Sequence, residues 1–135
     1  MVYIEYLEND QWLADVFYNN VVNLISEKEF VSFSEVSCIH GSDEWLLEYN
    51  KNYLNHDYYT DIITFDYSTE DFVSGDLLIS LTRVEDNAKK LNVSRETELK
   101  RVVIHGLLHL CGYKDKSKDE IEQMRKKEDY YLSLL

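Results

Sequence analysis

The stretch that decides the fold is 94-SRETELKRVVIHGLLHLCGYKD-115. Its apolar residues recur every three to four positions, so we expect one long helix that begins at Ser94 and buries one face in a core. The expected buried face consists of Leu99, Val102, Val103, Leu107 and Leu110. Gly112 is expected to end this helix and let the chain turn back, because glycine readily takes the left-handed conformation that closes a helix.

Two histidines lie four residues apart on this expected helix. Because residues at i and i+4 share a face, the imidazoles of His105 and His109 can point at one metal ion, and the bend at Gly112 returns Asp115 toward them. Three protein ligands leave a fourth position for water, as in catalytic zinc sites. We therefore predict that His105, His109 and Asp115 bind one zinc ion, or another divalent transition metal, which activates a water for hydrolysis.

The spacing of these ligands matches the extended zinc motif of metzincin proteases, with aspartate in the third place. That motif carries a glutamate general base after the first histidine, whereas this chain has Gly106. Peptide hydrolysis is therefore disfavoured, and no general base is assigned. Glycine at this position also allows the helix to pack closely on a neighbouring element.

The rest of the chain predicts further strands and helices from its apolar spacing. Strands are expected at residues 2–6, 31–39, 61–65 and 77–79, the last two adjacent and central. Helices are expected after a cap at Asn9 or Asp10, after Ser42, from Thr82 to Leu91, from Ser94 to Gly112, and after the capping box of Ser117 and Glu120. This mixture predicts an α+β fold: a single layered domain over residues 1–135, with a central, mostly four-stranded mixed sheet, about five helices and a zincin-like metal helix.

Length and charge narrow the classes of function. A chain of 135 residues has enough apolar material for one core and too little length for two ordinary domains. Its formal charge of −12 opposes generic nucleic-acid binding, which needs clustered cations. Residues 1–82 carry two basic and 16 acidic side chains, but residues 83–127 carry twelve basic and eight acidic ones. The second half can therefore form a local basic face, unless its lysines only solvate and pair along helices.

Other features predict an ordinary cytoplasmic protein. The N-terminus lacks a basic signal-like region, and no apolar run approaches the ~20 residues that span a bilayer. Cys38 and Cys111 lie inside apolar stretches and are expected to be small buried residues in a reducing compartment. His40 and His56 have no comparable neighbours and are expected to be surface or turn residues.

The run from His105 to Tyr113 resembles the hallmark helix of the YbeY family of bacterial ribosomal-RNA maturation endoribonucleases, His-Gly-x-Leu-His-Leu-x-Gly-Tyr. The runs Thr60–Phe65 and Gly75–Ser80 are similar to two further family segments, and Met124 and Glu128 fit the family's C-terminal helix. The resemblance covers residues 45 to 132. It implies a metal-dependent endoribonuclease specific for single-stranded RNA.

The implied process is 3′-end maturation of small-subunit ribosomal RNA and ribosome quality control, with the small ribosomal subunit as partner and neither DNA nor membrane as ligand. Two positions depart from the family. Asp115 stands where the family commonly has a histidine ligand, and Leu54 stands where it usually has arginine. Arginine can clamp a phosphate through two hydrogen bonds that leucine lacks, so substrate contacts must come from elsewhere, for example from the lysines after residue 83.

Two other functions stay open. The metzincin-like spacing suggests a metal-dependent hydrolase of peptides or small molecules, which Gly106 opposes. A non-catalytic ribosome-associated module, whose ion only fastens the last helix, is favoured by Leu54 and the acidic total. Asp61 and Asp76 could orient metal ligands, but capping or turn roles are preferred for both. Tyr113 is expected to close the core instead of stacking on a base.

Overall fold

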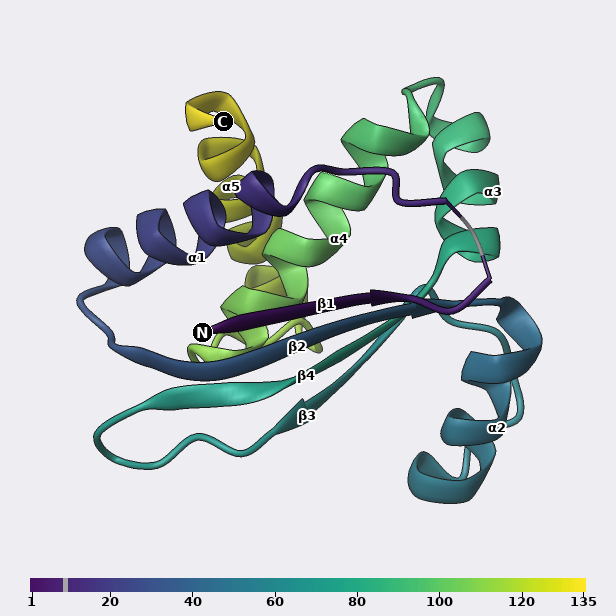
Figure 1. The fold of residues 1–135 in the computed structure, drawn as a ribbon, viewed down its shortest axis with the longest axis horizontal. Helices are drawn as coiled ribbons and strands as arrows, with labels where there is room; N and C mark the ends of the chain where they lie inside the picture. The colour runs from purple at the N-terminus through teal and green to yellow at the C-terminus, as the bar shows by residue number, and fades with distance from the viewer. Residues whose placement is uncertain (9) are drawn as a thin grey trace.

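The computed structural model describes residues 1–8 and 10–135, which form one four-stranded sheet and five helices (Figure 1). The strands are β1 (Val2–Tyr6), β2 (Phe33–Gly41), β3 (Ile62–Asp66) and β4 (Val73–Ser80). The helices are α1 (Asp15–Glu29), α2 (Asp43–Leu54), α3 (Leu81–Leu91), α4 (Arg95–Leu110) and α5 (Lys118–Leu134). The predicted α+β class with a mixed sheet is confirmed.

The strand order is β1-β2-β4-β3, with β1, β2 and β4 parallel and β3 antiparallel to β4. The prediction that the third and fourth strands are adjacent is confirmed, since Ile63 pairs with Leu78. Of these two strands, however, only β4 is central, because β3 forms an edge of the sheet. Pairing with both neighbours also makes β4 longer than the predicted strand.

Helices cover the two faces of the sheet unequally. Figure 1 shows α1, α3, α4 and α5 on one side and α2 alone on the other. Successive residues of a strand point to opposite faces, so Leu77 and Ile79 enter the main core while Leu78 joins a smaller cluster with Leu46 of α2 and Ile63. The main core therefore fixes α4 against the sheet, and α5 packs on α4.

Serine side chains begin most of the helices. Ser42, Ser94 and Ser117 accept hydrogen bonds from backbone N–H groups of the first turn, and Ser117 with Glu120 forms the predicted capping box. The helix predicted from Thr82 begins one residue earlier, at Leu81, and is capped by Ser80. These local signals were sufficient to place four of the helices.

The start of the first helix was predicted wrongly. Helix α1 begins at Asp15, with Ala14 as its N-terminal flanking residue, so the expected cap at Asp10 is incorrect. The alternative cap, Asn9, lies outside the described residues. Trp12 and Leu13 pack on the main core from the non-helical segment before α1. Their apolar character reflects this packing and does not extend the helix.

Gly106 lets α4 lie very close to β3 and β4. A Cβ atom at this position would be 2.7 Å from Ile62 Cδ1 and 2.8 Å from Leu77 Cδ2, which is too close for real side chains. The predicted tight packing is therefore confirmed. The glutamate that a metalloprotease would carry here would have to displace the ends of these two side chains.

The chain reverses after α4 as predicted. Gly112 has a φ of +103°, and the backbone N–H of Tyr113 donates to the Leu108 carbonyl at 3.1 Å. Cys111 is partly buried at this bend and Cys38 is fully buried, both as free thiols. Within the described part of the chain, no helix is long and apolar enough to cross a membrane.

His40 is fully buried, so its assignment to the surface was wrong. Its Nδ1 donates to the Glu5 carbonyl at 2.8 Å, its Nε2 accepts from the Tyr18 hydroxyl at 2.9 Å, and its ring stacks on Tyr6. Burial lowers the pKa of His40 to about 4, opposed only in part by the bond to Glu5. A neutral imidazole thus joins β1, α1 and β2, whereas His56 is exposed as expected.

Candidate metal centre

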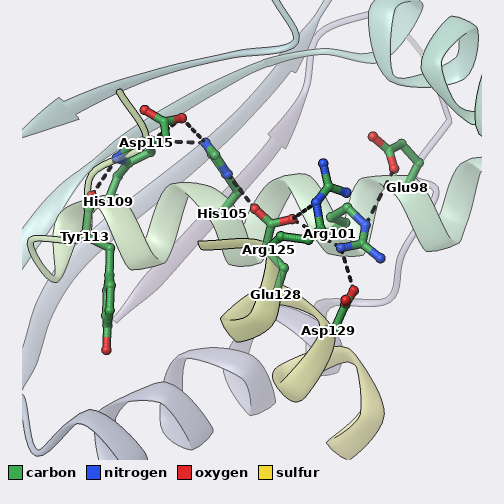
Figure 2. A network of polar contacts seen from close by, with 9 residues as sticks. All are labelled: Glu98, Arg101, His105, His109, Tyr113, Asp115, Arg125, Glu128 and Asp129. Carbon is green, nitrogen blue, oxygen red and sulfur yellow. Dashed lines mark hydrogen bonds and ion pairs between the residues drawn. The ribbon is translucent and has the colours of Figure 1, made fainter. Parts of the chain in front are cut away.

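The C-terminal end of α4 and the loop after it bring the three predicted ligands together (Figure 2). The Nε2 atoms of His105 and His109 are 3.0 Å apart. The Oδ2 atom of Asp115 lies 3.2 Å from the first and 3.3 Å from the second. The helical spacing and the bend at Gly112 therefore have the geometric effect that the sequence predicted.

The two rings are oriented so that their Nε2 lone pairs face each other. His109 Nδ1 lies 2.9 Å from the Tyr113 carbonyl, and His105 Nδ1 lies 2.7 Å from Glu128 Oε2. A carbonyl and an ionised carboxylate can only accept, so both Nδ1 atoms carry the proton. In the neutral rings both Nε2 atoms are then unprotonated. Two lone pairs at this separation repel unless a cation or a proton lies between them.

The spacing of the three donor atoms fits a zinc ion. Tetrahedral zinc with bonds of about 2.0–2.1 Å holds neighbouring ligand atoms about 3.3 Å apart. The side chains are 23% (His105), 26% (His109) and 38% (Asp115) exposed, so one side of the group is open. Two imidazoles and one carboxylate with an open fourth position are a donor set that zinc accepts.

Glu128 is the residue near this centre that sequence reasoning missed as a functional residue. It lies on α5 with a side chain only 6% exposed, and its other oxygen accepts from Arg101 Nη1 at 3.2 Å. Figure 2 shows Glu128 between His105 and Arg101. The sequence contains a signal for Glu128, which shares the apolar side of α5 with Met124 and Tyr131. A carboxylate on such a face needs charged or hydrogen-bonding partners.

The charges around His105 affect its protonation. Burial acts to lower the pKa of His105, but the hydrogen bond and charge of Glu128, with the charges of Asp115 and Asp61, raise it above the usual value. A more basic imidazole is a stronger ligand, but it also binds a competing proton more tightly. Metal bound here would be released as the pH falls.

Of the two aspartates considered as supporting residues, the structure brings only Asp61 to the centre. Asp61 and His105 both line two recesses, one of which also reaches His109 and the other Glu128. Burial raises the pKa of Asp61, and the charge of His105 opposes this in part. Asp76 lies in the middle of β4, opposite Phe65, so the turn role expected for it is wrong. The turn-prone residues before Leu77 are part of the strand.

Leu54 also faces the candidate centre. A recess of about 530 Å³ is lined by His105, His109, Asp115, Leu54 and Lys116. The position at which the resembled family carries arginine is therefore beside the ligands, and an apolar side chain occupies it. Tyr113 packs against the main core and donates its hydroxyl to Glu29 at 2.6 Å, which agrees with the expected closing role.

The chain is similar to known proteins over nearly all of its length. It matches the family model described as Endoribonuclease YbeY over residues 5–135. It is 48% identical over 132 residues to an endoribonuclease YbeY of Flavobacterium johnsoniae, covering 95% of this chain and 88% of that protein. It is 53% identical over 114 residues to one of Cytophaga hutchinsonii, covering 84% and 80%. The solution structure of TM1509 from Thermotoga maritima aligns with a TM-score of 0.65 and 29% identity, covering 98% of this chain and 87% of that one.

Proposed function

The chain belongs to the endoribonuclease YbeY family, and from this premise we propose that it is a zinc-dependent endoribonuclease of single-stranded RNA. Its proposed process is 3′-end maturation of small-subunit ribosomal RNA and ribosome quality control in the cytoplasm. Residues 1–135 would act as a single metal-dependent hydrolase domain. Another divalent transition metal could replace zinc with the same ligands.

One observation carries the metal assignment. The Nδ1 atoms of His105 and His109 each lie against an acceptor, Glu128 and the Tyr113 carbonyl, so the protons belong on Nδ1 and both Nε2 lone pairs point to one place beside the Asp115 carboxylate. Histidines that bind metals commonly have an Nδ1–H bonded to a carboxylate or carbonyl in this way. A cation at that point would remove the repulsion between the two lone pairs. The three proposed catalytic residues would therefore act as its ligands.

A bound zinc ion would supply a Lewis acid for a phosphoryl oxygen and would lower the pKa of a water toward neutrality. The protein's own contribution is to hold the ligands and to admit the RNA. Glu128 and the Tyr113 carbonyl fix the two rings, and Gly106 excludes a general base at the metalloprotease position. The exposed cations Lys116 and Arg125, which line the recesses at the centre, would attract RNA phosphates despite the acidic total charge.

The test uses purified protein and two RNAs, one single-stranded and one fully paired. We expect cleavage of the single-stranded RNA only, its loss with a chelator, and its recovery with added zinc. His109→Ala should reduce the rate at least about a hundredfold, as expected when a ligand to a catalytic metal is lost. His56→Ala is the matched control, because His56 is exposed and contacts Tyr58 away from the centre. Cleavage by His109→Ala at the rate of the control would refute the metal mechanism.

A second candidate is a ribosome-associated module in which the ion only fastens α5. Leu54 beside the centre favours it, and so does the path from the ligand His105 through Glu128 to α5. Zinc that raises the melting temperature of a protein unable to cut any RNA would select this function. The hydrolysis of peptides stays disfavoured, because Gly106 supplies no general base at the metalloprotease position.

A further inference from the structure

Glu98 is a buried carboxylate for which the proposed chemistry has no use. It lies on α4, seven residues before His105 and therefore about two helical turns away. Its side chain is 6% exposed, and its Oε1 has no hydrogen-bond partner among the described residues. Arg101 Nε forms an ion pair with this oxygen at 4.0 Å (Figure 2), a distance too long for a hydrogen bond. Buried polar atoms are normally paired, so this oxygen, which is itself shielded from solvent, lacks a hydrogen bond that a donor from outside the chain would supply.

Burying the Oε1 atom of Glu98 without a hydrogen bond costs free energy of folding. Burial, followed by the nearby charge of Asp61, raises the pKa of Glu98, opposed in part by Arg101 and Arg125. A buried carboxylate oxygen without a hydrogen bond destabilises the fold. A donor group from a ligand would remove that cost. A ligand N–H that bonds to Glu98 would therefore contribute more binding free energy than the same hydrogen bond at the protein surface.

A cavity joins Glu98 to the candidate metal centre. It has a volume of about 510 Å³, within the usual range of small-molecule sites, and its lining includes both Glu98 and the ligands His105 and Asp115. From His105 to Glu98 it extends about 10 Å along α4. A molecule held at Glu98 is thus close to whatever reacts at the metal centre.

The lining of this cavity favours an uncharged, donor-bearing group. Apolar wall positions are Ile62, Leu91, Val102, Ile121 and Met124. The lining also holds four acids, Asp61, Glu98, Asp115 and Glu128, against one half-buried cation, Arg101, whose guanidinium pairs with Glu128 and Asp129, so the interior disfavours an anion. Lys90 and Arg125 have side chains that are 68% and 58% exposed, so they can meet phosphates outside it. An uncharged base inside the cavity, with its phosphate at Lys90 and Arg125, fits both the acidic interior and the exposed cations.

We propose that this cavity binds one guanine base of the RNA substrate, with Glu98 accepting hydrogen bonds from its Watson–Crick edge. Guanine presents two neighbouring N–H groups on that edge, which one carboxylate can accept together. The apolar walls cover the faces of the base. The inference rests on the proposed ribonuclease function, which it deepens by giving the enzyme a base preference near the cut.

The first experiment measures binding without cleavage. The zinc-loaded chain of residues 1–135, labelled at the methyl groups of isoleucine and methionine, is titrated with each 5′-nucleoside monophosphate and followed by NMR. We expect GMP to shift the Ile121 and Met124 signals most. Glu98→Gln should weaken GMP binding about fivefold or more, the value of a good base contact. Glu96→Gln, the same change at an exposed position of α4, should have no effect.

A second variant tests the cavity even if the buried substitution Glu98→Gln destabilises the fold. Leu91, on the wall, is 54% exposed, so Leu91→Trp can fill the cavity without disturbing the core. It should abolish the nucleotide-induced shifts. The proposal is overturned if GMP shifts neither wall residue, if all four nucleotides bind equally, or if Glu98→Gln binds GMP as Glu96→Gln does.

The second experiment maps cuts in a randomised single-stranded RNA. The unmodified protein should prefer guanine at one fixed distance from the cut, and Glu98→Gln should lose that preference while Glu96→Gln keeps it. GMP binding that depends on Glu98, without any RNA cleavage, would refute the proposed ribonuclease and leave the base site standing. Cleavage without a base preference would refute the base site and leave the ribonuclease standing.

Discussion

The Nδ1 atom of His105 on α4 lies 2.7 Å from the Oε2 atom of Glu128 on α5. The last helix of the chain thereby fixes the ring of a proposed metal ligand. Glu128 is in turn held by Arg101 at 3.2 Å, and Arg101 by Asp129 at 2.9 Å. Metal binding and the docking of α5 are therefore expected to depend on each other.

Replacing Glu128 should weaken zinc binding while leaving the three ligands in place. We expect Glu128→Ala to lose about 10- to 100-fold in zinc affinity, measured by competition with a chromophoric chelator. Glu128→Gln should lose less, because its amide oxygen can still accept from His105 Nδ1. Glu122→Gln, at an exposed position of α5, is the control. Zinc affinity in Glu128→Ala equal to that control would contradict a positioning role.

Gly106→Ala should destabilise the fold. In an open helix this change stabilises by up to about 1 kcal/mol. Here the new methyl group would meet Ile62 and Leu77, so we expect a loss of about 1–3 kcal/mol from overpacking. Urea unfolding of both proteins measures the difference. A free energy of unfolding that is unchanged or higher would show that α4 can move away from β3 and β4 without cost.

His40 should make the fold sensitive to mild acid. Its folded pKa is lowered from 6.5 to about 4, so the unfolded chain binds the proton more readily. Stability is then lost as the pH falls from about 6.5 toward about 4, by at most about 1.4 kcal/mol per pH unit. We expect the free energy of unfolding in urea to fall more steeply with acid in the unmodified protein than in His40→Gln. Parallel pH dependences would exclude this contribution.

Leu54→Arg should strengthen RNA binding, because position 54 lines the recess at the candidate centre. One added phosphate contact should steepen the logarithmic salt dependence of binding to single-stranded RNA by about 0.7. Leu54→Gln, which is polar but uncharged, provides the comparison. Fluorescence anisotropy over a salt series gives both slopes. Equal slopes for the two variants would mean that an arginine here does not reach a phosphate.

The site could be predicted where it depends on local geometry. His105, His109 and Asp115 lie within eleven residues, and helical periodicity with one glycine bend determines how they meet. The serine caps and the capping box at Ser117 are equally local. Such features follow from backbone geometry over a few residues, so the sequence was sufficient.

The supporting residues depend on packing between distant segments, which periodicity does not describe. Glu128 reaches His105 only because α5 lies on α4, and Glu98 Oε1 lacks a hydrogen bond because the Nη1 atom of Arg101 bonds to Glu128 and Asp129. His40 was misplaced for the same reason, since Tyr6 and Tyr18 from other elements cover it. An acidic residue on an apolar helical stripe is the sequence signal that points to Glu128.

Zinc content tests the central claim most directly. Protein purified without an affinity tag, in unmodified form and as Asp115→Ala and Asp119→Ala, is analysed for metal by mass spectrometry. Asp119 is exposed in the first turn of α5 and serves as the matched acid. We predict about one zinc per chain in the unmodified protein and in Asp119→Ala, and little in Asp115→Ala. Zinc retained equally by Asp115→Ala and Asp119→Ala would contradict a centre built from two imidazoles and this carboxylate.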